Sequence, residues 1–340
     1  MSEGHMPAKL DSSSVARAVA GLSGWPFGPI HIGRLVRIGA EHGLSGTAHR
    51  VMARTEAGKR VTFVVKEDRV DGVERALAFH AAMGNRLRGS IPTCYGGSVD
   101  FRSGTGILYL EDIAPAHQGD VLVDPGDDAL RAAIRTIARV HAAFWRSRGA
   151  DHEPTPPSWK ADAWDDERWR DRLTRARSRF PAILSGAVTA RLRDLPARVA
   201  FAGRGLAAGP ASWIHGDAHL DNVLWRESGE AVLLDWAGAT IGPPAVDAAR
   251  FVVESPPTVA SDEGRVAALV EAYQAQLRAD GVPETEAGLV PRMIELAARP
   301  LAQGVVGWAG RLEDRPLDPR MERLRENALR SVVAWLDRVP

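Results

Sequence analysis

The stretch WIHGDAHLDNVLW, residues 213–225, places Asp217 and Asn222 five positions apart on one short loop. Two short β-type runs joined by a tight turn separate Asn222 from Asp235. A hairpin brings its two ends together, so we expect Asn222 and Asp235 to lie side by side. An amide oxygen and a carboxylate at one point are ligands that Mg²⁺ prefers when it also holds phosphate oxygens. Asp217 would then lie above that metal and accept a proton from an incoming hydroxyl.

A second signal is a lysine in a chain that hardly uses lysine, since only four of the 43 basic residues are lysines. Lys66 ends an alternating run whose apolar members, Val61, Phe63 and Val65, fall on one face. This alternation predicts a β-strand. A lysine at a strand end often extends its ammonium to solvent, and that interpretation stands beside a functional one.

The segment around this lysine, residues 34–68, is predicted to form three strands with a Gly/Ser loop between the first two. Gly43, Ser45 and Gly46 lie in that loop, where small residues let backbone N–H groups approach an anion. The arrangement is typical of a flap that covers phosphate groups.

The remaining pattern divides the chain into two lobes. Helical periodicity predicts helices in both of them, at 11–22, 72–88, 166–205 and 262–338. The apolar run 107–113 is predicted to be a strand that leaves the sheet toward a connector. We therefore place the boundary near Ile113, which gives lobes 1–113 and 114–340.

Length and charge exclude several classes of function. The 43 basic residues balance 43 acidic ones, so no excess charge attracts nucleic acid or a membrane surface. Cys94 is the only cysteine, which excludes an internal disulfide and a multi-cysteine zinc site. No run approaches about 18 uninterrupted apolar residues, so we expect no membrane span. We expect a cytoplasmic protein, monomeric or homodimeric, whose partner is a small molecule.

The spacing H-x-D-x-x-x-x-N at 215–222, followed by Asp235-Trp236-Ala237, resembles the catalytic loop and metal-binding aspartate of the protein-kinase-like superfamily. The HGD and DWA triplets resemble its small-molecule branch, the aminoglycoside phosphotransferase family with its choline-kinase-like relatives. The segments LYLEDIAP, IARVHAAFW and GPPAVDAARF are similar to that branch too. The resemblance implies a bilobal α+β fold, with an N-terminal antiparallel sheet and helix that bind nucleotide and a mainly helical C-terminal lobe that carries catalysis.

Carried over position by position, the resemblance implies roles for four residues. Asp217 would be the catalytic base, and Asn222 and Asp235 would be the Mg²⁺ ligands. Lys66 would contact the α- and β-phosphates of ATP, with GTP as the alternative nucleotide. Phosphoryl transfer needs mostly positioning and cationic stabilisation, which a lysine and a metal supply.

The acid that orients the lysine is chosen by position. Glu74 opens the helix that follows Lys66, so it is our choice, with Glu67, Asp68 and Asp71 as alternatives. The other interpretation of Glu74 is an exposed helix acid.

The nucleobase is expected to contact the backbone at 110–113, which includes Glu111 and Ile113. A strand that leaves its sheet there presents unpaired N–H and C=O groups.

Four polar residues near the loop are interpreted as structural. His215 and His219 are expected to brace the loop through hydrogen bonds or packing. Asp221 is interpreted as a turn cap rather than a third metal ligand. Asp247 is expected to cap its helix or to bond back to the catalytic loop.

The acceptor is expected to be a small molecule, because the chain from Asp235 reaches Pro243 without the long activation segment on which protein substrates dock. Our first hypothesis is an antibiotic, an aminoglycoside or another type such as a nucleoside, and a resistance function. The second is a metabolic kinase for a choline-like, amino-alcohol or sugar substrate. A nucleotide-binding pseudokinase is a third hypothesis, but it requires the loss of a catalytic residue, and Lys66, Asp217, Asn222 and Asp235 are all present.

The sequence predicts the residues that line the acceptor site less clearly than it predicts the catalytic residues. Acids at 163–169 and 312–318 would suit a cationic aminoglycoside, yet arginines lie among them and leave a neutral antibiotic open. The tryptophans of the same region are interpreted as core and lid packing, with a substrate wall as the alternative: Trp145, Trp159, Trp164 and Trp169.

Overall fold

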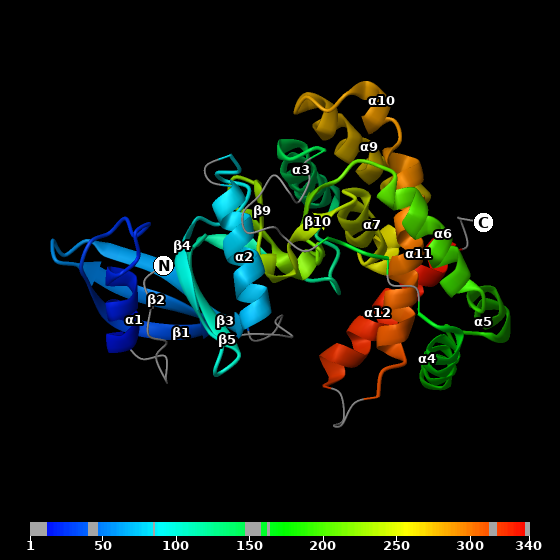
Figure 1. Ribbon diagram of the computed structural model, residues 1–340, viewed down its shortest axis with the longest axis horizontal. Helices are drawn as coiled ribbons and strands as arrows, with labels where there is room; N and C mark the ends of the chain where they lie inside the picture. Colours follow the sequence, from blue (N-terminus) through cyan, green and yellow to red (C-terminus); the bar gives the residue numbers. More distant parts are fainter. Residues whose placement is uncertain are drawn as a thin grey trace.

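The computed structural model describes residues 12–39, 47–83, 86–146, 158–161, 164–312 and 318–336. Figure 1 shows a sheet flanked by helices at the N-terminal end and a mainly helical region that follows it. The α+β class with an N-terminal antiparallel sheet is therefore confirmed. No helix within these ranges is both long enough and apolar enough to cross a membrane.

The N-terminal sheet is antiparallel throughout, in the order β1-β2-β3-β5-β4. Its strands are β1 (Ile30–Ile38), β2 (Thr47–Thr55), β3 (Arg60–Arg69), β4 (Cys94–Asp100) and β5 (Thr105–Glu111). Helix α1 (Ser12–Ala20) packs on one face, and α2 (Val70–Met83) packs on the other face. The predicted meander with its tight second turn is present.

The side chains of β3 alternate between a buried core on one face of the sheet and a cavity on the other face. Val61, Phe63 and Val65 are buried in the cluster that α1 covers. Lys66 points to the opposite face, toward the rest of the chain, because successive strand residues alternate. The strand prediction from this run is confirmed, and Lys66 is not a solvated strand end, since only 13% of its side chain is exposed.

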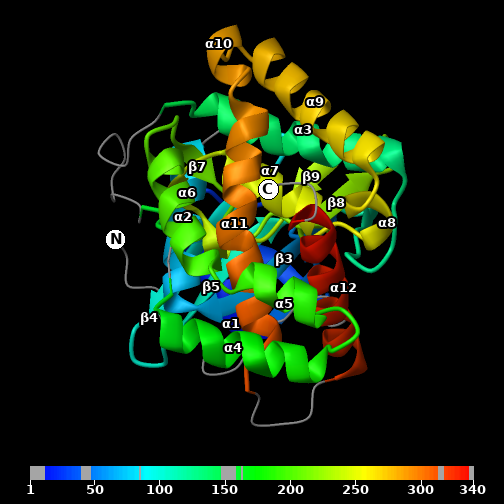
Figure 2. The ribbon, with the colours of Figure 1, turned by 90° about the vertical axis from the view of Figure 1, so that its right-hand side faces the viewer.

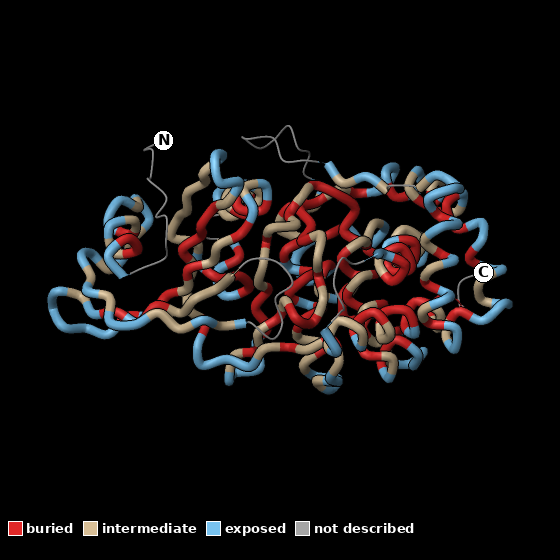
Figure 3. Tube along the Cα trace, turned by 90° about the horizontal axis from the view of Figure 1, so that it is seen from below, coloured by how far each residue is buried: buried red, intermediate tan, exposed pale blue. Residues whose placement is uncertain are grey.

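The C-terminal region consists largely of helices, namely α3 (Asp127–Ala143), α4 (Asp166–Arg179), α5 (Gly186–Leu192), α6 (Leu195–Ala207), α7 (Ala245–Val253), α8 (Pro257–Ala260), α9 (Glu263–Ala279), α10 (Glu284–Ala287), α11 (Val290–Ala309) and α12 (Pro319–Leu336). Helix α11 lies at the centre and contacts α4, α6, α7 and α12 (Figure 2). Buried residues run from α2 through these helices as a second core (Figure 3).

Short strands connect the two regions. Strands β6 (Ala116–Gln118), β8 (Val223–Arg226) and β9 (Ala231–Leu233) form one small sheet, and β7 (Ser212–Ile214) pairs with β10 (Thr240–Gly242). The predicted hairpin is the β8–β9 pair. The backbone N–H of Leu234 donates to the carbonyl of Asn222 at 2.8 Å, so the open end of the hairpin brings Asn222 next to the residue before Asp235.

Several predicted element ends differ from the structure, and the helical stretches predicted at 166–205 and 262–338 are each divided into several helices. Helix α2 ends at Met83 rather than at residue 88, because residues 86–90 form turns, the first of which bonds Arg86 N–H to the Met83 carbonyl. Strand β5 runs from Thr105 to Glu111, so Ile113 lies beyond it in the connector. We retain the lobe boundary near Ile113 as a proposal.

Candidate active site

Two cavities share one edge of the hairpin. The first has a volume of about 300 Å³ and is lined by Lys66, the segment 110–114 and the hairpin. The second has a volume of about 560 Å³ and is lined by Asp217, by α7 and by residues of α11 and α12. Both cavities are lined by Asp221, Asn222 and Asp235, so these residues form the wall at which the cavities meet.

The loop that carries Asp217 begins with a required glycine. Gly216 has φ +77°, and a Cβ at this position would lie 2.4 Å from the carbonyl oxygen of Gly238. Any other side chain would have to push this oxygen away, because non-bonded carbon and oxygen atoms do not approach so closely. The HGD triplet therefore lets the loop lie against the 3₁₀ turn Trp236–Gly238.

Asp247 on α7 holds the start of this loop. Its carboxylate accepts from the backbone N–H of His215 at 2.5 Å and from that of Gly216 at 2.9 Å, and it contacts His141 Nε2 at 3.1 Å. The carboxylate is buried, and its pKa is lowered because these bonds outweigh the effect of burial. Of the two interpretations of Asp247, bonding back to the loop is the one that the structure shows.

His215 links the loop to the hairpin. Its Nε2 lies 2.5 Å from the carbonyl oxygen of Leu234, and its Nδ1 accepts from the backbone N–H of Asp217 at 3.2 Å. A donor at Nε2 and an acceptor at Nδ1 describe one neutral tautomer. His215 thus fixes the distance between Asp217 and the strand that leads to Asp235, and its expected bracing role is confirmed.

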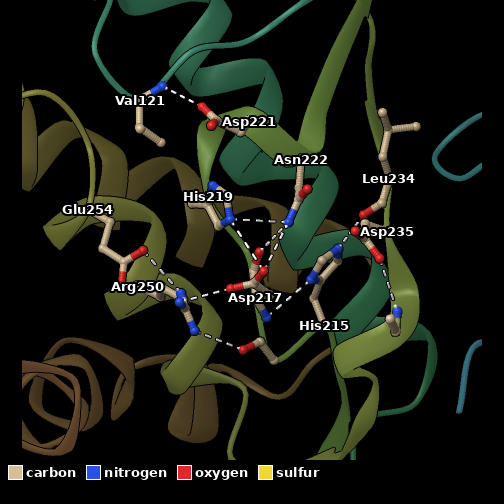
Figure 4. Close-up of polar contacts among 12 residues, drawn as sticks. Val121, His215, Asp217, His219, Asp221, Asn222, Leu234, Asp235, Arg250 and Glu254 are labelled. Carbon is tan, nitrogen blue, oxygen red and sulfur yellow. Dashed lines mark hydrogen bonds and ion pairs between the residues drawn. The ribbon is translucent and has the colours of Figure 1, made fainter. Parts of the chain in front are cut away.

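Asp217 faces the second cavity with 43% of its side chain exposed (Figure 4). Burial raises the pKa of this carboxyl, but the guanidinium of Arg250, 2.8 Å away, and the ring of His219, 3.4 Å away, lower it well below its usual range. Asn222 Nδ2 donates to the Asp217 carbonyl at 2.9 Å. Asp217 is therefore ionised and oriented before any acceptor arrives.

Lys66 lies between two carboxylates. Its Nζ is 2.5 Å from Asp235 Oδ1 and 3.1 Å from Asp68 Oδ2. Burial lowers the pKa of this lysine, yet the two acids together raise it above its usual value. The structure does not bring Glu74 to Lys66, because Glu74 is exposed on α2. The inward side of α2 carries Phe79, which stacks on Trp236 with ring centroids 3.6 Å apart.

Asp235 has an uncommon backbone, with φ +58° in the left-handed region. Its Oδ1 accepts from Ala237 N–H at 3.4 Å, which caps the 3₁₀ turn that follows. Among the described residues no cluster of three or more His, Cys, Asp and Glu side chains is placed to hold a metal. One carboxylate from Asp235 and one amide oxygen from Asn222 nevertheless fit Mg²⁺, which commonly keeps water and takes phosphate oxygens as its other ligands.

Asp221 acts away from the metal pair. The backbone N–H of Val121 donates to its Oδ1 at 2.7 Å, and Arg320 Nη2 on α12 lies 3.0 Å from its Oδ2. It ties the loop to the connector and to the last helix. The sequence predicts a structural role for Asp221 as the cap of its own turn, and the structure shows a structural role with other partners.

His219 contacts both Asp217 and Asn222, with Nε2 3.3 Å from Asn222 Nδ2.

The predicted nucleotide contacts lie in the Gly/Ser loop and in the connector, and the structure describes only those in the connector. Gly43, Ser45 and Gly46 lie outside the described residues. Glu111 and Ile113 line the first cavity, but the Glu111 N–H already donates to the Thr93 carbonyl at 2.8 Å.

The tryptophans divide between packing and lining. Trp169 is buried and donates to the Leu192 carbonyl, and Trp145 donates to Glu286. Trp159 and Trp164 line the second cavity, together with Trp308 of α11, which sequence reasoning missed. The ring of Trp164 lies against Gly307, where a Cβ would come within 1.9 Å of it.

Sequence reasoning also missed Arg250. This arginine follows Asp247 by three residues on α7, so a helical projection would have placed both on the face toward the loop.

The acids at 165–167 do not line the second cavity, and Asp165 caps α4 instead. Residues 313–317 lie outside the described ranges.

Comparison with known proteins gives a family and a fold. The model of the phosphotransferase enzyme family matches residues 42–289. No curated protein shows significant similarity to the sequence.

Three solved structures illustrate the fold. A candidate aminoglycoside phosphotransferase from Ralstonia eutropha JMP134 has a TM-score of 0.58 at 15% identity, over 96% of this chain and 98% of that chain. A spectinomycin phosphotransferase in complex with ADP and spectinomycin has a TM-score of 0.56 at 12% identity, over 96% and 99%. A Plasmodium vivax ethanolamine kinase has a TM-score of 0.53 at 10% identity, over 90% and 81%.

Proposed function

The chain belongs to the phosphotransferase enzyme family, and we propose that it transfers the γ-phosphate of ATP to a hydroxyl group of a small molecule. The first cavity takes the nucleotide, with lobe 1–113 as its nucleotide-binding part, and GTP is the alternative donor. The second cavity takes the acceptor within the catalytic lobe 114–340. The observation that carries the proposal is the shared wall, where Asn222 and Asp235 line both cavities.

A shared wall places the reacting groups at one point. Lys66 lies on the nucleotide side, and Asp217 lies on the acceptor side. A phosphate held by the lysine and a hydroxyl bonded to the aspartate then approach each other across the wall. Holding two reactants in such an orientation supplies much of the rate enhancement of phosphoryl transfer.

Asp217 orients the acceptor and receives its proton. Because its pKa is low, this carboxylate is a weak base toward a free hydroxyl. It takes the proton only as the bond from oxygen to phosphorus forms and the hydroxyl becomes acidic. Arg250 holds Oδ1 at 2.8 Å, so the acceptor hydroxyl bonds to the exposed part of the carboxylate.

Lys66 and the metal pair stabilise phosphate charge. Lys66 is paired with Asp68 and Asp235, and we infer that its ammonium turns to the α- and β-phosphates when they bind. Asn222 and Asp235 would hold Mg²⁺, which neutralises developing charge on the phosphoryl oxygens when bound. Asp68 then orients Lys66, as the acid expected on the helix would.

The acceptor class is proposed from the family. An antibiotic hydroxyl is the first candidate, and one similar fold is a spectinomycin phosphotransferase. A metabolic acceptor of the choline or amino-alcohol type is the second candidate, since another similar fold is an ethanolamine kinase. A pseudokinase is disfavoured because Lys66, Asp217, Asn222 and Asp235 all line the two cavities.

The test is ADP release by purified protein with ATP and Mg²⁺, measured against a panel of antibiotics, amino alcohols and sugars. We expect release that depends on one acceptor, stops when EDTA removes the metal, and is lost in Asp217→Asn. If no acceptor raises ADP release and Mg·ATP does not bind in calorimetry, the proposed function is wrong.

A further inference from the structure

We propose that the second cavity takes an uncharged, hydroxyl-bearing molecule of drug-like size with an apolar or aromatic part, and that it discriminates against polycations. This proposal rests on the proposed phosphotransfer function and narrows its acceptor class. Three features of the described residues carry it, namely the pairing of the carboxylates, the cations on the tryptophan rings, and the size and lining of the cavity.

The first feature is that two of the carboxylates share one arginine of α7 as an ion-pair partner. Arg250 contacts Asp217 Oδ1 at 2.8 Å and Glu254 Oε2 at 3.2 Å. The ring of His219 lies beside the same aspartate, with Nε2 3.4 Å from Asp217 Oδ2. A ligand ammonium at Asp217 would therefore have to approach the positive guanidinium of Arg250.

The other two carboxylates of the cavity have cations as well. Asp221 lies 3.0 Å from Arg320, which also contacts Asp120 at 3.0 Å. Asp235 lies 2.5 Å from Lys66, which also contacts Asp68 at 3.1 Å. Among the described residues that line the cavity, every carboxylate thus has a cation of the chain within 3.2 Å. A polycation needs carboxylates that gain a partner on binding, because exchanging one ion pair for another yields little free energy.

The second feature concerns the aromatic rings. The guanidinium of Arg168 lies 4.2 Å from the ring centroid of Trp164, and that of Arg325 lies 5.1 Å from the ring centroid of Trp308. A tryptophan face attracts a quaternary ammonium through its quadrupole. A guanidinium over one face weakens the attraction of these two rings for a second cation, so they offer mainly apolar contact rather than a cage for choline.

The third feature is the cavity itself. Its volume of about 560 Å³ falls within the range of about 300–1,000 Å³ that is common for drug-sized ligands. Leu301 and Val305 of α11 and Leu324 of α12 give it apolar lining, and the amides of Gln303 and Asn327 add neutral polar groups. A molecule as small as choline would leave most of this volume unfilled.

The test measures binding to the parent protein by calorimetry with four probes, with no nucleotide added so that no turnover occurs. Uridine and p-nitrophenyl glucoside are the uncharged probes, kanamycin is the polycation, and choline is the small monocation. We expect at least one uncharged probe to bind about tenfold more tightly than either cation. A smaller margin, tighter binding of a cation, or no binding of the uncharged probes at millimolar concentration overturns the proposal.

Two variants test the cause of the discrimination. Arg320→Gln removes the cation beside Asp221, so kanamycin should bind several-fold more tightly while uncharged probes are unaffected. Arg323→Gln is the matched control, because Arg323 lies on the same helix and is exposed away from the cavity. If both variants bind kanamycin as the parent protein does, the pairing of Asp221 does not cause the discrimination and the proposal fails.

A second variant covers the case in which Arg320→Gln does not fold. Trp164→Leu should weaken binding of the uncharged probe about tenfold, whereas Phe201→Leu, at an exposed position of α6, should not. If both variants bind the uncharged probe equally well, the aromatic lining does not contribute to binding and the proposal is wrong.

The two proposals fail in different ways. Stabilisation of the protein by Mg·ATP does not require a bound acceptor. If Mg·ATP stabilises the protein while kanamycin is the preferred acceptor, only the present inference is wrong. If Mg·ATP has no effect, the proposed function is wrong.

Discussion

The two cavities on either side of Asn222 and Asp235 are built from different kinds of sequence. The proposed nucleotide side is formed by the strand ladder, its connector, α2 and the hairpin, and it brings Lys66 next to Asp235 across 169 residues of sequence. The acceptor side is closed by Trp164, Trp308 and Asn327, which come from distant segments that only helix packing unites. The arrangement of Asp217, Asn222 and Asp235 is therefore local in the sequence, whereas Lys66 and the acceptor wall reach it through tertiary packing. Variants on the two sides should separate nucleotide binding from turnover.

The largest effect is expected at the shared wall. Asp235→Asn removes the only charged ligand of the proposed Mg²⁺ pair and one partner of Lys66, so Mg·ATP binding should fall below detection in calorimetry. Asparagine is chosen because it tolerates the left-handed backbone at φ +58°. Asp128→Asn, at a fully exposed carboxylate, is the control. An unchanged affinity for Mg·ATP would place the metal elsewhere.

The next effect belongs to the acceptor side alone. Asp217→Asn keeps the shape of the side chain but removes the proton acceptor, so kcat should fall by about 10² to 10⁴. The affinity for ATP should stay near that of the parent protein, because Asp217 lines only the second cavity. Turnover at the parent rate with any accepted substrate would remove Asp217 from its proposed role.

A smaller effect is expected on the nucleotide side from Lys66→Arg. The ammonium fits between Asp68 and Asp235 at 3.1 and 2.5 Å, and a planar guanidinium is wider. Displacement of the phosphates by about 1 Å would cost on the order of 10²-fold in rate. Steady-state phosphotransfer measures this loss.

The control for that variant is Lys59→Arg, at an exposed position of the β2–β3 turn. Without nucleotide, both variants should melt at the temperature of the parent protein. Full activity in Lys66→Arg would withdraw the phosphate contact and revive the pseudokinase hypothesis.

The smallest effect is expected at Arg250, which positions Asp217 and lowers its pKa. Arg250→Gln should reduce kcat/KM about tenfold, because a hydrogen bond to a charged group contributes about 1.5–3 kcal/mol. The pKa of Asp217 should rise, so the carboxylate becomes protonated at higher pH than before. Activity should then fall at a higher pH on the acid side of the profile. A profile that keeps its shape would give Arg250 a purely structural role.

Much of this site could be predicted from the sequence because its geometry is local. The spacing of Asp217, Asn222 and Asp235 fixes their arrangement through one loop and one hairpin, and alternation along β3 fixes the face of Lys66. The same alternation places Asp68, two residues on, beside Lys66, yet we chose Glu74 by its position on a helix. The helix instead packs Phe79 onto Trp236, a contact between distant segments.

The acceptor wall could not be predicted for the same physical reason. Trp308 and Asn327 reach the cavity only because α11 and α12 pack as they do, and periodicity gives the apolar face of a helix but not its partner. Arg250 could have been predicted from the sequence, since it shares a helix face with Asp247. The pairing of the acids with Arg250 and Arg320 needs the tertiary structure.

The central claim is that one cavity binds nucleotide and the other completes the transfer. The most direct measurement is the rise in melting temperature that Mg·ATP causes, compared side by side in Asp217→Asn and Lys66→Arg. A ligand at about 100 times its Kd stabilises a protein by about 2.7 kcal/mol, which is readily detected. We predict that Asp217→Asn keeps the full rise and that Lys66→Arg loses most of it. An equal rise in both variants, or its loss in both, would contradict the division between the two cavities.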